Sequence, residues 1–171
     1  MELVYVYEQD GVSFSPSFML SKNIFMPVAS NTNNTDKEAL DNITTNFFKF
    51  FASTDPGEID PAIIKSICIP ETIIIKKTGL NEIVYDVASF LEPRIKILTD
   101  GTLTNFEESE MNEETTIIGN IAQRFSRYQK SGYLNDKYFH EYGNKFFQFI
   151  KTNNGWKINA LIWEDDEIKP T

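Results

Sequence analysis

The sequence predicts an α+β fold in which helices come first and a curved antiparallel sheet follows. Two observations carry this prediction. From Asp36 to about residue 99, apolar residues recur mainly at three- and four-residue spacing, as they do on amphipathic helices. From Leu103 onward they alternate, as they do on half-buried strands. Because the helices precede the strands instead of alternating with them, a doubly wound parallel sheet is excluded.

The clearest helical pattern runs from Asp36 to near Ser53, with Thr35 or Asp36 as its N-cap. Its apolar stripe consists of Ala39, Leu40, Ile43, Phe47, Phe50 and Phe51. A phenylalanine run at this spacing is typical of a helix that faces a core, so we do not interpret it as a cofactor-binding motif.

Two shorter helices and one strand are expected next. Residues 59–67 and 86–99 show helical spacing, and Pro93 is expected to kink the later helix. Between them, residues 72–77 are rich in β-branched residues, which favour a strand. The sequence therefore predicts three helices, with one strand inserted before the third.

Four stretches of β pattern complete the chain, at residues 103–110, 115–130, 138–151 and 156–164. Turn residues separate the last three, so these should form an antiparallel meander. On the final strand, alternation places Trp156 and Trp163 on opposite faces. We interpret the acidic cluster on the first stretch as solvated surface; it consists of Glu107, Glu108, Glu110, Glu113 and Glu114.

Residues 1–35 are assigned to an extension, separate from a domain at residues 36–171. Leu3 to Phe14 contains the turn dipeptide Asp10-Gly11 between alternating segments, which predicts a small hairpin. The polar run at residues 29–35 is expected to be a linker. An isolated hairpin is marginal in water, so we expect it to pair with a sheet edge or a partner.

Composition excludes several classes of function. The 171 residues contain 16 Lys and Arg against 25 Asp and Glu, a net charge of −9, which is the wrong sign for a nucleic-acid partner. Cys68 and His140 are the single cysteine and the single histidine, so we expect no disulfide, no metal site and no cofactor. No apolar run reaches the roughly 18 residues of a membrane span, and without an export signal we expect a cytoplasmic protein.

The order of elements is similar to that of the nuclear transport factor 2-like superfamily. The resemblance rests on residues 47–55, 89–94, 119–128 and 154–163, and it covers residues 36 to about 167. It implies a cone, in which a strongly curved antiparallel sheet wraps around three helices and leaves a pocket. Folds of this kind host enzymes, binding modules and adaptors, so the resemblance does not select a function.

The steroid isomerases of that superfamily, which this chain resembles only in fold, use a tyrosine on the first helix and two aspartates. The corresponding positions here hold Phe47, Ile73 or Ile74, and Gln148. Neither apolar position can transfer a proton, and only Gln148 can donate a hydrogen bond. We therefore expect no isomerase chemistry by that route.

We expect a mostly apolar pocket inside the cone. Alternation gives His140 a strand face in common with Asn144 and Gln148, and if that face points inward these become polar groups in an aromatic cavity. The expected lining consists of Phe47, Phe51, Phe90, Asn120, Arg124, Tyr128, His140, Asn144, Phe146, Gln148 and Trp163. Arg124 has two interpretations, a clamp for a ligand carboxylate or a salt bridge to the acidic cluster.

Three functions stay open. The first is cofactor-free binding of a small apolar organic ligand by a homodimer formed through the sheet. The second is a lyase or isomerase acting on a carbonyl or polyketide-like compound, with His140 as proton shuttle and Arg124 or Gln148 as oxyanion partner. The third is a protein-interaction domain in which Leu3 to Phe14 adds a strand to another chain.

Overall fold

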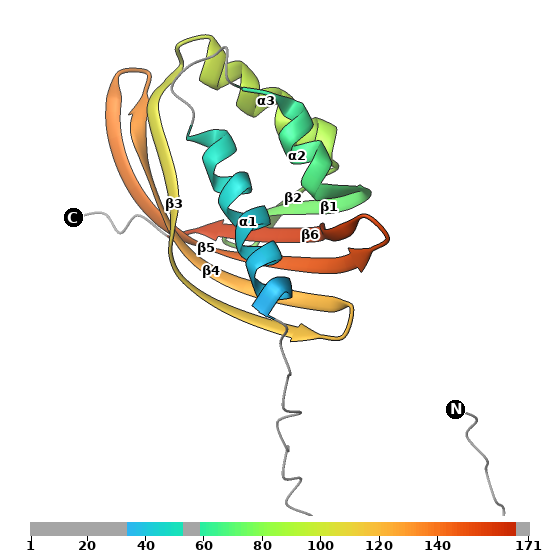
Figure 1. Ribbon diagram of the computed structural model, residues 1–171. Helices are drawn as coiled ribbons and strands as arrows, with labels where there is room; N and C mark the ends of the chain where they lie inside the picture. The colour runs from blue at the N-terminus through green and yellow to red at the C-terminus, as the bar shows by residue number, and fades with distance from the viewer. Residues whose placement is uncertain (1–33, 53–58, 167–171) are drawn as a thin grey trace, which may run out of the picture.

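The computed structural model describes residues 34–52 and 59–166. Three helices lie on the concave side of one curved six-stranded sheet (Figure 1). The predicted α+β class and the curved sheet around three helices are therefore confirmed. The hairpin expected over Leu3 to Phe14 lies outside the described residues, as does most of the linker expected at residues 29–35, whose last two residues, Asn34 and Thr35, belong to the first helix.

The first helix, α1 (Asn34–Phe51), crosses the concave face of the sheet (Figure 1). Asp36 in its first turn accepts hydrogen bonds from Trp156 Nε1 at 2.9 Å and from Lys151 Nζ at 2.7 Å. These bonds lower the pKa of Asp36, and they attach the start of the helix to the far end of the sheet.

The other helices are short and begin at aspartate caps. Asp60 caps α2 (Pro61–Ile67) and Asp86 caps α3 (Val87–Thr99). Each side chain accepts a hydrogen bond from a first-turn N–H group that has no partner within its helix. Pro93 lies inside α3, as the sequence indicated, and the helix continues past it.

The strands are β1 (Cys68–Thr78), β2 (Asn81–Tyr85), β3 (Leu103–Ile118), β4 (Ile121–Leu134), β5 (Lys137–Thr152) and β6 (Gly155–Asp165). Their order across the sheet is β2-β1-β6-β5-β4-β3. All neighbours are antiparallel except β1 and β6, which are parallel. The sheet is therefore mixed, whereas the sequence predicted an antiparallel one.

Two hairpin turns were missed from the sequence. The single strand predicted over residues 115–130 is two strands that turn at Gly119 and Asn120, and Gly119 adopts a φ of +58°. A similar turn at Gly79 produces β2, which was not predicted. Glycine at the first position of a two-residue turn is a hairpin signal, because glycine adopts positive φ without steric cost.

Irregular pairing bends the sheet and changes which side chains face the helices. Two register shifts lie in β3, and one lies in β6, where Asn159 has no paired residue on β5. Each extra residue reverses the alternation beyond it. Trp156 and Trp163 are therefore both buried, although strict alternation placed them on opposite faces.

An aromatic cluster fills the space between α1 and the sheet. The Phe47 ring lies 5.3 Å from the rings of both Phe51 and Phe147. Phe147 of β5 is fully buried, whereas its neighbour Phe146 is 54% exposed on the outer face. The inner face of β5 is therefore the one that carries Phe147.

Alanine substitution of Phe147 and of Phe146 tests which face of β5 packs against the helices. Phe147→Ala should lower the free energy of unfolding by about 3–5 kcal/mol, because it leaves a cavity in the aromatic cluster. Phe146→Ala should change it by less than about 0.5 kcal/mol, since the side chain is exposed. Urea unfolding at a protein concentration low enough to keep both variants monomeric measures the difference. A larger cost for Phe146→Ala would show that the face is assigned wrongly.

Candidate functional site

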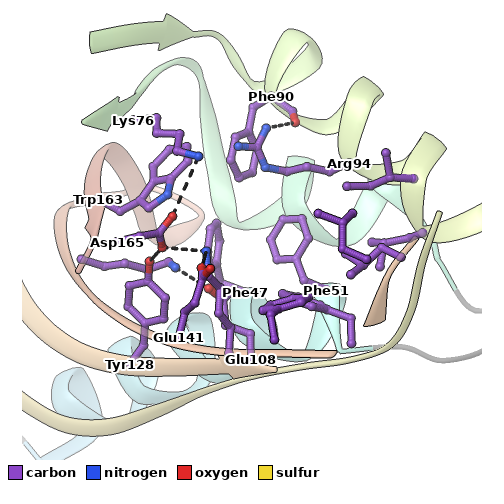
Figure 2. Close-up of a pocket in the computed structure, with 18 of the residues that line it drawn as sticks. Phe47, Phe51, Lys76, Phe90, Arg94, Glu108, Tyr128, Glu141, Trp163 and Asp165 are labelled. Carbon is purple, nitrogen blue, oxygen red and sulfur yellow. Dashed lines mark hydrogen bonds and ion pairs between the residues drawn. The ribbon is translucent and has the colours of Figure 1, made fainter. Parts of the chain in front are cut away.

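A cavity of about 570 Å³ lies on the concave side of the sheet, bordered by α1, α3 and strands including β4, β5 and β6. Figure 2 shows Lys76, Glu108, Glu141 and Asp165 gathered on one side of it, whereas Arg94 lies apart from them beside Phe90. Its apolar lining consists of Phe47, Phe51, Phe90, Ile97, Leu98, Leu103, Phe106, Leu134, Phe139, Leu161 and Trp163. A cavity of this size and composition is typical of sites for small organic molecules.

Asp165 is the centre of the charged side. Lys130 Nζ lies 2.7 Å from its carboxylate, Lys76 Nζ lies 3.8 Å from it, and the Tyr128 hydroxyl donates a hydrogen bond to it (Figure 2). Lys130 also pairs with Glu141 at 3.2 Å. One carboxylate therefore joins side chains from β1, β4 and β6.

The pKa values of this group follow from burial and hydrogen bonding. Burial raises the pKa of Asp165, but the hydrogen bonds from Lys130 and Tyr128 outweigh that effect, and the pKa is lowered overall. Burial and the carboxylate both raise the pKa of Tyr128. Asp165 is therefore ionised and Tyr128 is neutral at neutral pH.

Lys145 and Glu108 form a second, more deeply buried pair. Lys145 Nζ lies 2.6 Å from Glu108 Oε1, and the two side chains are 5% and 8% exposed. The same Nζ lies 3.4 Å from the centroid of the Tyr128 ring. Burial lowers the pKa of Lys145, an effect that Glu108 opposes.

The Arg94 guanidinium lies against three aromatic rings. Its Cζ atom is 3.9 Å from the Phe90 ring centroid and 5.2 Å from the centroids of Tyr85 and Trp163. Nη1 donates to the Phe90 carbonyl oxygen at 2.7 Å (Figure 2). Within residues 34–52 and 59–166 no carboxylate pairs with Arg94, and burial lowers its pKa. A guanidinium has five N–H donors, so Arg94 has donors left for a molecule in the cavity.

Basic residues outnumber acidic ones in the cavity lining, the opposite of the balance in the whole chain. Its basic lining residues are Lys76, Arg94, Lys130, Lys137 and Lys145, and its acidic lining residues are Glu108, Glu141 and Asp165. In the whole sequence, by contrast, acidic residues outnumber basic ones by 25 to 16. The interior therefore favours an anion, whereas the net charge of the chain does not.

No family model matches the chain, and the search of curated proteins found no match. Solved structures are similar in fold. A nuclear transport factor 2-like superfamily protein from Salmonella enterica superposes with a TM-score of 0.64 at 15% identity, covering 80% of this chain and 94% of that one. The chain has the nuclear transport factor 2-like fold.

Two further structures show the same fold. The hexachlorocyclohexane dehydrochlorinase LinA-type3 from Novosphingobium barchaimii has a TM-score of 0.63 at 11% identity, covering 80% of this chain and 90% of that one. A protein from Planctomyces limnophilus has a TM-score of 0.63 at 12% identity, covering 78% and 98%. At these identities the likeness concerns the nuclear transport factor 2-like fold and not the activity.

Five of the residues expected to line the pocket do line the cavity: Phe47, Phe51, Phe90, Tyr128 and Trp163. The other six do not, and they lie in three different places. Asn120 is exposed in the turn between β3 and β4. The remaining five lie on the outer face of β5 or in a separate ion-pair cluster.

The prediction that the His140 face of β5 points into the cavity was wrong. His140, Asn144, Phe146 and Gln148 lie on the outer face, and His140 is exposed. Both faces of this strand carry aromatic residues, so alternation alone does not identify the inner one. An exposed imidazole on the outer face cannot shuttle protons for a molecule in the cavity, so the predicted lyase or isomerase geometry around His140 is absent.

Arg124 does point inward, but its guanidinium is held by carboxylates. Glu110 accepts hydrogen bonds from Nε and Nη2, and Asp41 accepts one from Nη1 at 2.6 Å. The predicted salt bridge to the acidic cluster is therefore present, yet Arg124 is only 4% exposed. Glu108 and Glu110 are likewise not solvated surface, since both point inward and pair with buried cations.

Within the described residues, no group of three or more His, Cys, Asp or Glu side chains is arranged to hold a metal ion. In the same part of the chain, no helix has the length and apolar character needed to cross a bilayer.

Asp165→Asn tests whether the charged network is held together by one carboxylate. The variant should lose about 1–3 kcal/mol of unfolding free energy at pH 7, because Lys130 and Tyr128 lose a buried acceptor. The folded-state pKa of Asp165 lies below its unfolded value of about 3.9, so this stability exists above that pH and is lost as pH falls through the folded pKa. The difference from wild type should therefore shrink below about pH 4.

Asp166→Asn is the matched control, since Asp166 pairs with Arg127 on the exposed side. Asp166→Asn should lower the free energy of unfolding by less than about 1 kcal/mol. Chemical unfolding of both variants from pH 3 to pH 8 makes the comparison. Equal losses, or an Asp165→Asn difference that does not depend on pH, would contradict the proposed role of Asp165.

Proposed function

We propose that the cavity binds a small organic acid, a molecule with an aromatic or aliphatic body and one carboxylate. The observation that carries this proposal is Arg94, whose guanidinium borders the cavity among aromatic rings without a carboxylate partner in the described residues. A ligand carboxylate would accept the N–H donors that the Phe90 carbonyl leaves available.

The apolar side of the cavity supports the same class of ligand. Phe47, Phe51 and Phe90 present ring surfaces toward it, and Leu98 and Leu103 extend this surface. The hydrophobic effect favours burial of a ring or short alkyl chain against such a wall. The ligand class is therefore narrower than the apolar molecule expected from the sequence, because an uncharged ligand would leave Arg94 unmatched.

One structural neighbour is consistent with a small organic ligand. By its name, the LinA-type3 protein from Novosphingobium barchaimii acts on hexachlorocyclohexane, a small molecule. The fold thus accommodates such compounds in at least one case. The charged lining described above is the reason to propose an acid for this chain.

Substitution of Arg94 tests the proposal. A panel of aromatic acids such as 4-methylbenzoate and 2-naphthoate should raise the unfolding temperature of the wild type in a concentration-dependent way. Arg94→Gln should weaken the binding of the same acids about tenfold or more, because a charge-assisted hydrogen bond is lost. Titration calorimetry measures both affinities.

Arg127→Gln is the matched control, because Arg127 pairs with Asp166 on the outer side of the sheet. It should leave the affinity unchanged, and the amides corresponding to each acid should bind the wild type more weakly. If none of the acids binds, or if Arg94→Gln binds them as tightly as the wild type does, the proposal is wrong.

We also propose that the chain forms a homodimer through the outer face of the sheet. Ile75, Ile162, Phe146 and Phe125 are register partners across four adjacent strands, and they form an apolar row on that face. Phe146 is 54% exposed and Ile162 is 41% exposed. An exposed apolar surface that continues over several strands is typical of a protein interface.

Phe146→Asp should convert the dimer into a monomer, because it places a charge at the centre of the apolar row. Leu80→Asp is the control, since Leu80 is 97% exposed in a turn and lies outside the row. Light scattering coupled to size exclusion gives the mass of each. A wild type that is monomeric, or a Phe146→Asp variant that keeps the wild-type mass, argues against this interface.

A further inference from the structure

Lys145 has surroundings that differ from those of the other lysines at the cavity. It lies on the inner face of β5, it lines the cavity, and its side chain is almost entirely removed from solvent. Its amine has one carboxylate partner, Glu108, and it packs on the Tyr128 ring. Lys130, in contrast, pairs with two carboxylates, Asp165 and Glu141.

We propose that Lys145 is a nucleophile that forms an imine with an aldehyde or ketone bound in the cavity. This inference depends on the proposed function only in that a small organic molecule must enter the cavity. A desolvated amine next to a proton acceptor is an arrangement that activates a lysine for imine formation.

Glu108 is placed to move the protons. The hydrogen bond of 2.6 Å allows the ammonium group of Lys145 to pass a proton to the Glu108 carboxylate, which leaves a neutral amine. Burial makes this transfer easier, because desolvation penalises the charged form of the amine. The lowered pKa of Lys145 agrees with such a transfer.

The reaction balances without an oxidant or reductant. The amine lone pair forms a C–N bond to the carbonyl carbon, and the C=O π electrons move to oxygen. Glu108 gives its proton to that oxygen and takes one from the nitrogen, which produces a carbinolamine. A second proton from Glu108 lets the hydroxyl leave as water, and the nitrogen lone pair forms the protonated imine. Glu108 is again a carboxylate, as it was at the start.

Reductive trapping tests this proposal. The full-length protein is incubated with 4-formylbenzoate and sodium cyanoborohydride, and intact mass and peptide mapping follow the product. We expect one adduct per chain, at Lys145, formed about tenfold or more faster than adducts at exposed lysines such as Lys65. Benzaldehyde serves as a second probe that lacks the carboxylate.

Two variants test the role of the Lys145 amine and the role of Glu108 independently. Lys145→Arg keeps a cation beside Glu108 but cannot form an imine, so it should abolish the fast adduct. Glu108→Gln removes the proton acceptor and should slow trapping at Lys145 about tenfold. Circular dichroism shows whether each variant is folded, and mapping of the wild-type adduct decides the question even if a variant is not. Trapping spread evenly over exposed lysines would overturn the proposal.

The failure of this inference can be told apart from failure of the proposed function. If 4-methylbenzoate binds and Arg94→Gln weakens it, but no adduct forms at Lys145, the imine is wrong and the acid site stands. If benzaldehyde modifies Lys145 while no aromatic acid binds, the acid site is wrong and the imine stands.

Discussion

Charged side chains that point into the concave side of this sheet must find partners there, and the rest of the site depends on that requirement. An unpaired buried charge costs far more than a buried ion pair. Asp165 meets the requirement for Lys130 and Tyr128, and Glu108 meets it for Lys145. The pairs come from β3, β4, β5 and β6, so the curvature that brings these strands around one cavity also brings the charges together.

The cavity consequently combines an apolar wall with a network of paired charges. Lys76, Lys130 and Lys145 are matched by carboxylates of the protein, whereas Arg94 contacts the Phe90 carbonyl oxygen, the Tyr85 side chain and aromatic rings, with no carboxylate partner within the described residues. Two kinds of basic group thus border one space. The paired amine of Lys145 has a neighbouring proton acceptor, and the guanidinium of Arg94 has donors available to an anion. An acid that also contains a carbonyl group could use both.

The sequence predicted the parts of this structure that depend on local periodicity. The stripe of α1 identified Phe47 and Phe51, and the order of helices and strands predicted the fold. On β5, however, Phe146 and Phe147 are equally apolar, so only packing against α1 decides which of them is inner. The register shift at Asn159 had no local signal either, although the turn at Gly119 did.

The charged side of the cavity was missed for a different reason. Glu141 and Lys145 share a face of β5 with Phe147, because they are separated from it by even numbers of positions. Once the inner face is known, the sequence therefore predicts that both point inward. Their partners lie on other strands, and Glu108 is one of several glutamates in an acidic run. Only three-dimensional pairing distinguishes it from Glu107, which is exposed. Sequence patterns therefore located the aromatic half of the site and not the ionic half.

A crystal structure of the protein with 4-methylbenzoate tests the central claim most directly. The account predicts the ligand ring against Phe47 and Phe90, and its carboxylate within hydrogen-bond distance of the Arg94 guanidinium. A ligand bound only on the outer face of the sheet, or an Arg94 side chain paired with a carboxylate of the protein while the cavity stays closed to the ligand, would contradict it.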